Sequence, residues 1–118
     1  MYDGLYCKVF IDAEMDYARL FDLIMNCVAG KKEGIDYIIT DWCDISVQRN
    51  KEYKLEQYLK DSTDFLYWKY YLDIEPLNVD ETQYINNVAN LLRYLKEYGM
   101  RVIIACDFEE EVNTIKIV

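Results

Sequence analysis

The chain has 118 residues, of which 53% are hydrophobic, and carries a formal net charge of -9. This length supports one core and is too short for two ordinary domains, so we expect a single domain over residues 1–118. So acidic a chain is repelled by phosphate backbones and anionic lipid, which excludes nucleic acid and membrane surfaces as favoured partners and favours a basic protein.

The cysteines and the missing histidines exclude several further classes. The chain has no histidine, and its four cysteines form no CxxC pair, so zinc fingers, thioredoxin-like motifs and Cys-His nucleophiles are all excluded. The N-terminus has no signal-peptide pattern, and the longest apolar run, residues 102–106, is far shorter than the ~20 residues of a membrane helix. We therefore expect a cytoplasmic protein with reduced cysteines, no metal and no cofactor.

The first elements are predicted by a change of hydrophobic period. Residues 5–11 alternate and predict a strand, and the apolar residues that follow recur at spacings of three and four, which predicts a helix near residues 14–29. Asp12 or Asp16 is suited to cap the start of this helix, and Gly30 to end it.

The central region returns to alternation. Residues 35–48 predict a strand, but Asp41 falls on its apolar side, which indicates a bulge or bend near Asp41 and Trp42 rather than a buried charge. The polar residues 49–64 predict a long hairpin connection with a short helix through residues 53–59.

Residues 65–74, "FLYWKYYLDI", give the strongest strand signal in the chain. One predicted face carries Leu66, Trp68, Tyr70, Leu72 and Ile74, and the other carries Phe65, Tyr67, Lys69, Tyr71 and Asp73. The single proline, Pro76, is expected to end this strand.

The last third predicts a second helix and a buried strand. A capping box over residues 80–83 opens a helical stripe near residues 81–98, which Gly99 closes. Residues 102–106 predict a buried strand, and residues 113–118 predict a short edge strand.

The order of these elements is strand, helix, strand, strand, helix, strand. We therefore predict an α+β fold, a ferredoxin-like two-layer sandwich (βαββαβ) with two helices on one face of an antiparallel sheet. In that topology the first and last strands lie side by side. The alternative is an open α/β sheet with a short extra strand.

No pattern in the sequence favours catalysis. The run Asp107, Glu109, Glu110 and Glu111 follows the last core strand, and clustered carboxylates can hold a cation or share a proton. Yet this run has no EF-hand spacing and no nearby histidine or arginine for a second catalytic role. The serines lie outside GxSxG, and no glycine cluster forms a phosphate loop. We therefore expect that this protein is not an enzyme.

Aromatic content suggests a binding surface instead. The chain has 12 tyrosines, and the predicted strand points Tyr67 and Tyr71 at the sheet face without helices. Tyrosine with scattered carboxylates is typical of protein interfaces. The alternative is that these aromatic residues form cross-strand pairs that only stabilise the sheet. The predicted partner-binding residues are Asp107, Glu109, Glu110, Glu111, Tyr67, Tyr71, Asp41 and Asp44.

The closing piece "LLRYLKEYGMRVIIACDFEEEV", residues 91–112, resembles the small acidic immunity proteins of bacterial polymorphic and contact-dependent toxin systems. The resemblance implies an antitoxin that binds and neutralises a cognate toxin, often a nuclease with a basic cleft. The resemblance implies no catalytic residues in this chain. The alternatives are a regulatory or ligand-binding ferredoxin-like domain that forms a homodimer through its open sheet face, and a phage-encoded acidic inhibitor that mimics nucleic acid.

Overall fold

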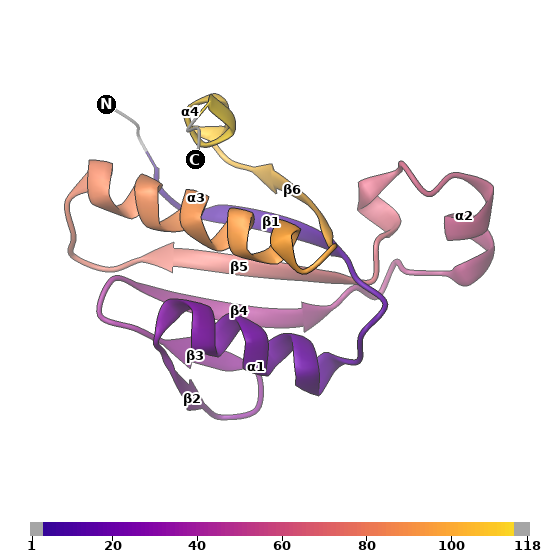
Figure 1. The fold of residues 1–118 in the computed structure, drawn as a ribbon, viewed down its shortest axis with the longest axis horizontal. Helices are drawn as coiled ribbons and strands as arrows, with labels where there is room; N and C mark the ends of the chain where they lie inside the picture. The colour runs from indigo at the N-terminus through magenta and orange to yellow at the C-terminus, as the bar shows by residue number, and fades with distance from the viewer. Residues whose placement is uncertain (1–3, 115–118) are drawn as a thin grey trace.

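The structure is a computed structural model that describes residues 4–114, and it has an α+β fold with one six-stranded antiparallel sheet (Figure 1). The elements in chain order are β1 (Cys7–Asp12), α1 (Tyr17–Val28), β2 (Lys31–Glu33), β3 (Tyr37–Ile39), β4 (Cys43–Arg49), α2 (Leu55–Lys60), the 3-10 helix η1 (Phe65–Tyr67), β5 (Tyr70–Pro76), α3 (Glu81–Glu97), β6 (Arg101–Ala105) and α4 (Glu109–Thr114). The strand order across the sheet is β2-β3-β4-β5-β1-β6.

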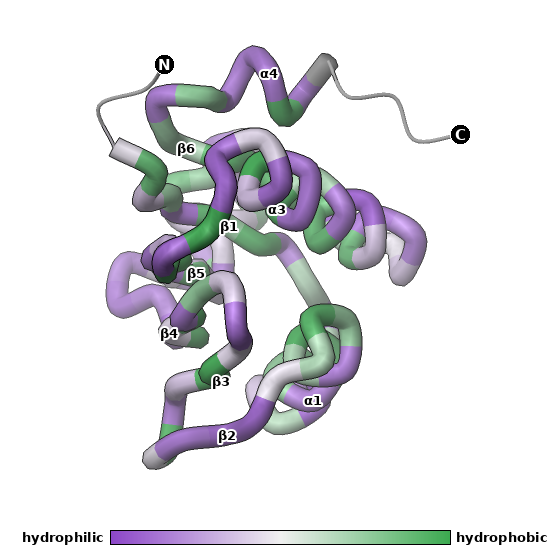
Figure 2. The backbone as a smooth tube through the Cα atoms, turned by 90° about the vertical axis from the view of Figure 1, so that its left-hand side faces the viewer, coloured by the Kyte–Doolittle hydropathy of each residue, from purple (hydrophilic) through white to green (hydrophobic). Residues whose placement is uncertain are grey.

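The predicted pairing of the first and last core strands is confirmed. Strand β1 lies between β5 and β6, with Val9 opposite Leu72 on one side and Ile104 on the other. Helices α1 and α3 cover the same face of the sheet, in front of the strands in Figure 1 and to their right in Figure 2. The opposite face has neither of these helices, and we call it the open face.

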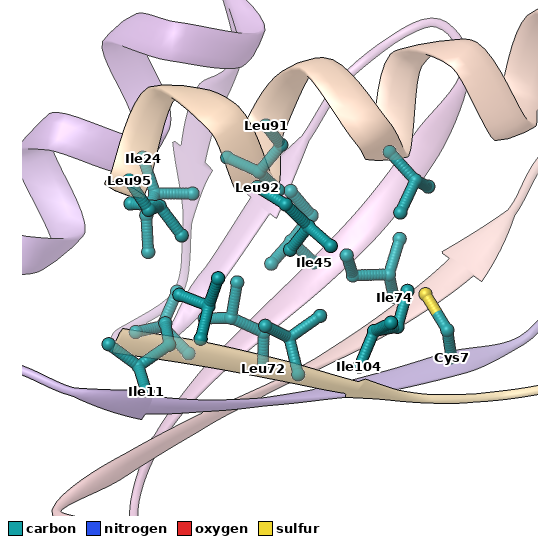
Figure 3. Packing of buried hydrophobic residues seen from close by; sticks show 14 of the residues in the cluster. Cys7, Ile11, Ile24, Ile45, Leu72, Ile74, Leu91, Leu92, Leu95 and Ile104 are labelled. Carbon is teal, nitrogen blue, oxygen red and sulfur yellow. The ribbon is translucent and has the colours of Figure 1, made fainter. Parts of the chain in front are cut away.

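The core lies between the sheet and these two helices (Figure 3). Alternate strand residues point into it, and those with no exposed surface are Cys7, Val9, Ile11, Ile38, Cys43, Ile45, Val47, Leu72 and Ile74. They meet the apolar stripes of the helices, which include Leu20, Ile24, Leu91 and Leu95. Each aliphatic side chain buried in this way contributes about 1.5–3 kcal/mol.

Helix α1 begins as predicted and ends differently. The backbone N–H of Arg19 donates to the Asp16 carboxylate over 2.9 Å, so Asp16 is the N-cap. The left-handed residue at the end is Ala29, with φ 53°, and not Gly30. Gly30 is needed for close packing, because a Cβ there would lie 2.4 Å from Cγ2 of Ile38.

Substitutions at these two neighbouring positions are expected to change stability in opposite directions. Ala29→Gly should raise the free energy of unfolding by about 0.5–1 kcal/mol, since it relieves a left-handed alanine. Gly30→Ala should lower the free energy of unfolding, because its methyl group collides with Ile38. Thermal unfolding followed by circular dichroism tests both. A lower melting temperature for Ala29→Gly would contradict this account of the helix end.

Helix α3 confirms the second predicted helix. Asp80 accepts a hydrogen bond from the backbone N–H of Gln83 over 3.0 Å, which is the capping contact that the sequence predicts. Gly99 follows the helix with φ 85°, a conformation that glycine adopts without strain. The chain then enters β6 directly.

The predicted bend near Asp41 and Trp42 is confirmed, but the single strand predicted over residues 35–48 is wrong, because these residues form two strands, β3 and β4. Thr40 closes the turn between β3 and β4: its hydroxyl oxygen accepts from the backbone N–H groups of Trp42 (3.0 Å) and Cys43 (2.9 Å). The turn leaves Asp41 exposed. Strand β2, which the sequence did not predict, pairs with β3 and extends the sheet.

The strand predicted over residues 65–74 is wrong in its first half. Residues 65–67 form η1, capped by the Asp64 carboxylate, and β5 begins only at Tyr70. The indole N–H of Trp68 donates to the carbonyl of Ser62 over 2.8 Å, which holds the chain in a turn before the strand. Within the preceding connection, α2 confirms the predicted short helix.

The C-terminal region also differs from the prediction. Residues 109–114 form α4, which includes residues 113 and 114 of the predicted edge strand, and residues 115–118 of that strand lie outside the described residues. Phe108 and Val112 are buried and anchor α4 to the body. The ring of Phe108 lies 5.9 Å from that of Tyr84 on α3.

Candidate protein-binding face

The open face is described by the register of the strands. Residues 8, 10 and 12 of β1 alternate with its core residues and so lie on this face. One row across the face runs Lys8, Asp73, Ser46 and Tyr37, and the next runs Phe10, Tyr71 and Gln48. The predicted tyrosine surface is therefore present at Tyr71.

An acidic hollow of about 530 Å³ lies on this face. Its lining residues are Tyr6, Tyr37, Asp44, Ser46, Asp73 and Glu75. Three of the six carry a carboxylate and none carries a positive charge, whereas the two tyrosines supply aromatic surface with polar tips. Such a hollow is complementary to the lysine and arginine side chains of a basic protein.

Hydrogen bonds fix two walls of the acidic hollow. The Tyr6 hydroxyl donates to the Asp73 carboxylate, and partial burial together with that carboxylate raises the pKa of Tyr6 above its ordinary value. The Gln48 amide donates to Ser46 over 2.6 Å and to Asp36 over 2.7 Å. These bonds hold the side chains of Tyr6 and Ser46 in place, which lowers the entropic cost of ordering them when a partner binds.

A second depression of about 380 Å³ adjoins the hollow, and we call it the lobe groove. It is lined by Lys8, Phe10, Asn50, Glu52, Leu66, Tyr67 and Tyr71. The Phe10 ring lies 5.1 Å from Phe65 and 6.4 Å from Tyr71, and the Lys8 ammonium lies 4.1 Å above the Tyr71 ring. Lys8 of the groove and Asp73 of the hollow are cross-strand neighbours, so the two depressions lie side by side on the open face.

The structure brings three of the eight predicted site residues to this face. Asp44 lines the acidic hollow, and Tyr67 and Tyr71 line the lobe groove, although Tyr67 belongs to η1 and not to the strand that was expected to present it. Asp41 lies in the exposed β3–β4 turn.

The other four predicted residues lie elsewhere. Asp107 lies two residues before the start of α4, which begins with Glu109, Glu110 and Glu111 and packs against α3. None of these four lines the hollow or the groove. The acidic residues thus form two separate surfaces, one on the open face and one on α4.

Sequence reasoning missed Tyr6, Tyr37, Ser46, Asp73 and Glu75 as parts of the hollow. Asp73 carries the clearest signal, since it shares the predicted strand face with Tyr71. Tyr6 carries a weaker signal, because it alternates with core residue Cys7 just before β1. Tyr37 carries none, because its strand was not separated from β4.

Another hollow of about 530 Å³ lies beside α1 and has mixed charge. Two of its cations already contact aromatic rings: the Arg49 guanidinium lies 4.0 Å over Tyr17, and the Lys32 ammonium lies 5.5 Å from the Phe21 centroid. Asp22 also lines it. Because the lining of this hollow combines cations with carboxylates, it offers a partner no single charge to match, so we prefer the open face as the candidate site.

The reactive side chains offer little chemistry. Burial raises the pKa of Cys43 to about 12 and the pKa values of Cys27 and Cys106 to about 11, and it raises that of Cys7 further. These thiols are protonated at neutral pH and are therefore poor nucleophiles. Within residues 4–114, histidine, cysteine and acidic side chains form no group of three that suits a metal ion.

Across the described part of the chain, none of the helices has the length and apolar character to span a membrane. No family model, curated protein or solved structure matched this chain in the comparisons. The physical character of the open face is therefore the basis for inferring function.

Proposed function

We propose that this chain is an immunity protein that binds and neutralises a cognate basic toxin domain through its open face. The observation that carries the proposal is the acidic hollow, in which Asp44, Asp73 and Glu75 lie beside two tyrosines. The net charge of -9 accelerates the approach of a basic partner over a longer range. The toxin as partner follows from the resemblance of residues 91–112, and the function is binding rather than catalysis.

We also propose that β1, α1, β4, β5, α3 and β6 constitute a ferredoxin-like unit. Their strand order, β4-β5-β1-β6, and the two helices on one face support it. The β2–β3 hairpin and α4 are then additions at its two edges. This topology leaves one sheet face free for the toxin.

Co-expression with the protein encoded by the adjacent gene tests this function. We expect that protein to arrest growth of the host when expressed alone and to be harmless together with this chain. The purified pair should form a stable complex by size-exclusion chromatography. Growth arrest that this chain does not relieve, or a chain that associates only with itself, would contradict the proposal.

A further inference from the structure

Residues 50–68 form a lobe that projects beyond the end of the sheet (Figure 1). No residue of its helix α2 is buried, and its large aliphatic side chains face solvent: Leu59 is 73% exposed and Leu66 is 54% exposed. A lobe this poor in core contacts is expected to be mobile unless other interactions fix it.

Polar contacts fix the base of the lobe. The Asn50 side-chain amide donates to the carbonyls of Leu66 (2.9 Å) and Trp68 (2.7 Å), and its oxygen accepts from the backbone N–H of Glu52 (3.0 Å). One side chain therefore joins the two ends of the connection. It also places Leu66 beside the open face.

A second set of contacts holds the lobe to the sheet. Arg101 on β6 donates to the Asp12 carboxylate over 2.6 Å and to the Ser62 carbonyl over 2.7 Å. The Tyr58 hydroxyl donates to the same carboxylate over 3.1 Å. The Arg101 guanidinium also lies 4.9 Å from the Trp68 ring centroid, so the lobe is held in place without a core of its own.

The lobe groove has the character of an anchor pocket. Aromatic side chains supply its floor, Leu66 supplies an exposed aliphatic wall, and the single cation Lys8 is balanced by Glu52. The acidic hollow beside it is charged and open, whereas this groove is apolar and near neutral. The two therefore suit different parts of one partner surface.

We propose that the lobe groove receives one apolar side chain, aliphatic or aromatic, of the same basic partner whose cationic residues meet the acidic hollow. This inference rests on the proposed function and adds the anchor of the interface to it. The occupant is identified by the charge complementarity of the hollow to a basic partner and by the position of the groove beside the hollow, where Lys8 and Asp73 are cross-strand neighbours. Hot spots in interfaces lie in well-packed pockets from which water is excluded, and aromatic side chains are enriched among them.

Leu66→Ala tests the anchor, with Leu59→Ala as a matched control on the part of the lobe that does not line the groove. We expect Leu66→Ala to speed dissociation from the adjacent-gene protein by about tenfold or more and to leave association and its salt dependence unchanged. Leu59→Ala should change neither rate. The Leu66→Met variant should keep most of the wild-type affinity that Leu66→Ala loses. Surface plasmon resonance at two salt concentrations measures these rates.

Tyr67→Ala is the second variant and should also speed dissociation, with circular dichroism confirming that each variant is folded. Unchanged dissociation for folded Leu66→Ala and Tyr67→Ala overturns the anchor. An equal effect of Leu59→Ala overturns it too. If the anchor proposal fails in this way, the proposed function still holds provided that the wild-type chain binds and that reversing the charge of carboxylates in the hollow slows association. If the wild-type chain does not bind, both proposals fall.

Discussion

Replacing Phe108 by alanine is expected to lower the free energy of unfolding by about 3–5 kcal/mol. The Phe108 side chain is 1% exposed and its ring meets Tyr84, which in turn meets Trp42 with 5.7 Å between the centroids. Removing the ring opens a cavity in the aromatic cluster and releases the main anchor of α4. The measurement is chemical unfolding in urea, followed by tryptophan fluorescence.

Glu109→Ala is the control for this prediction. Glu109 lies in the first turn of α4 and is exposed, so its removal should change the free energy of unfolding by no more than about 0.5 kcal/mol. A Phe108→Ala protein as stable as the wild type would show that α4 is not packed as described.

Reversing the charge of two carboxylates in the acidic hollow is expected to have the largest effect on binding. Asp44→Lys together with Glu75→Lys should slow association with the adjacent-gene protein by about 10–100-fold at low salt and weaken its salt dependence. Neither side chain belongs to the core cluster, so the variant should fold. Stopped-flow fluorescence at several salt concentrations measures the association rate.

Glu109→Lys together with Glu110→Lys makes the same change of charge on α4. If the open face binds the toxin, this control should slow association far less, since only the overall charge acts over that distance. The two double variants thus decide between the two acidic surfaces. A larger effect from α4 would move the interface there and contradict the assignment to the open face.

Local signals were sufficient to predict helices α1, α2 and α3 and strands β1 and β6. The aspartates that cap α1 and α3 lie where the sequence indicates, and Val9, Leu72 and Ile104 alternate into the core as expected. These features depend on side-chain periodicity and on contacts within a few residues. Such information is contained in short windows of sequence.

The errors arose where distant contacts decide the structure. Residues 65–69 alternate like a strand, but Asn50 and Ser62 bind the backbone and the indole in this region and hold it out of the sheet. Residues 109–114 fold as a helix because Phe108 has an aromatic pocket on α3 to fill. Neither set of contacts can be identified from the residues immediately next to these segments in the sequence.

The candidate site was only partly predictable for the same reason. Tyr71 and Asp44 could be assigned to exposed strand positions from alternation alone. The acidic hollow, however, combines side chains from the segment before β1 with others from β3, β4 and β5. Its existence depends on the strand order, which brings Tyr6 to Asp73 across 67 positions of sequence.

Chemical-shift mapping tests the central claim, that the open face binds the partner, most directly. The ¹⁵N-labelled chain would be titrated with the adjacent-gene protein and its amide signals followed by NMR. We predict that the largest changes fall at Asp44, Tyr71 and Asp73, and at Leu66 beside the groove, while the exposed sides of α1 and α3 remain unchanged. Changes confined to those helices or to α4 would contradict the account.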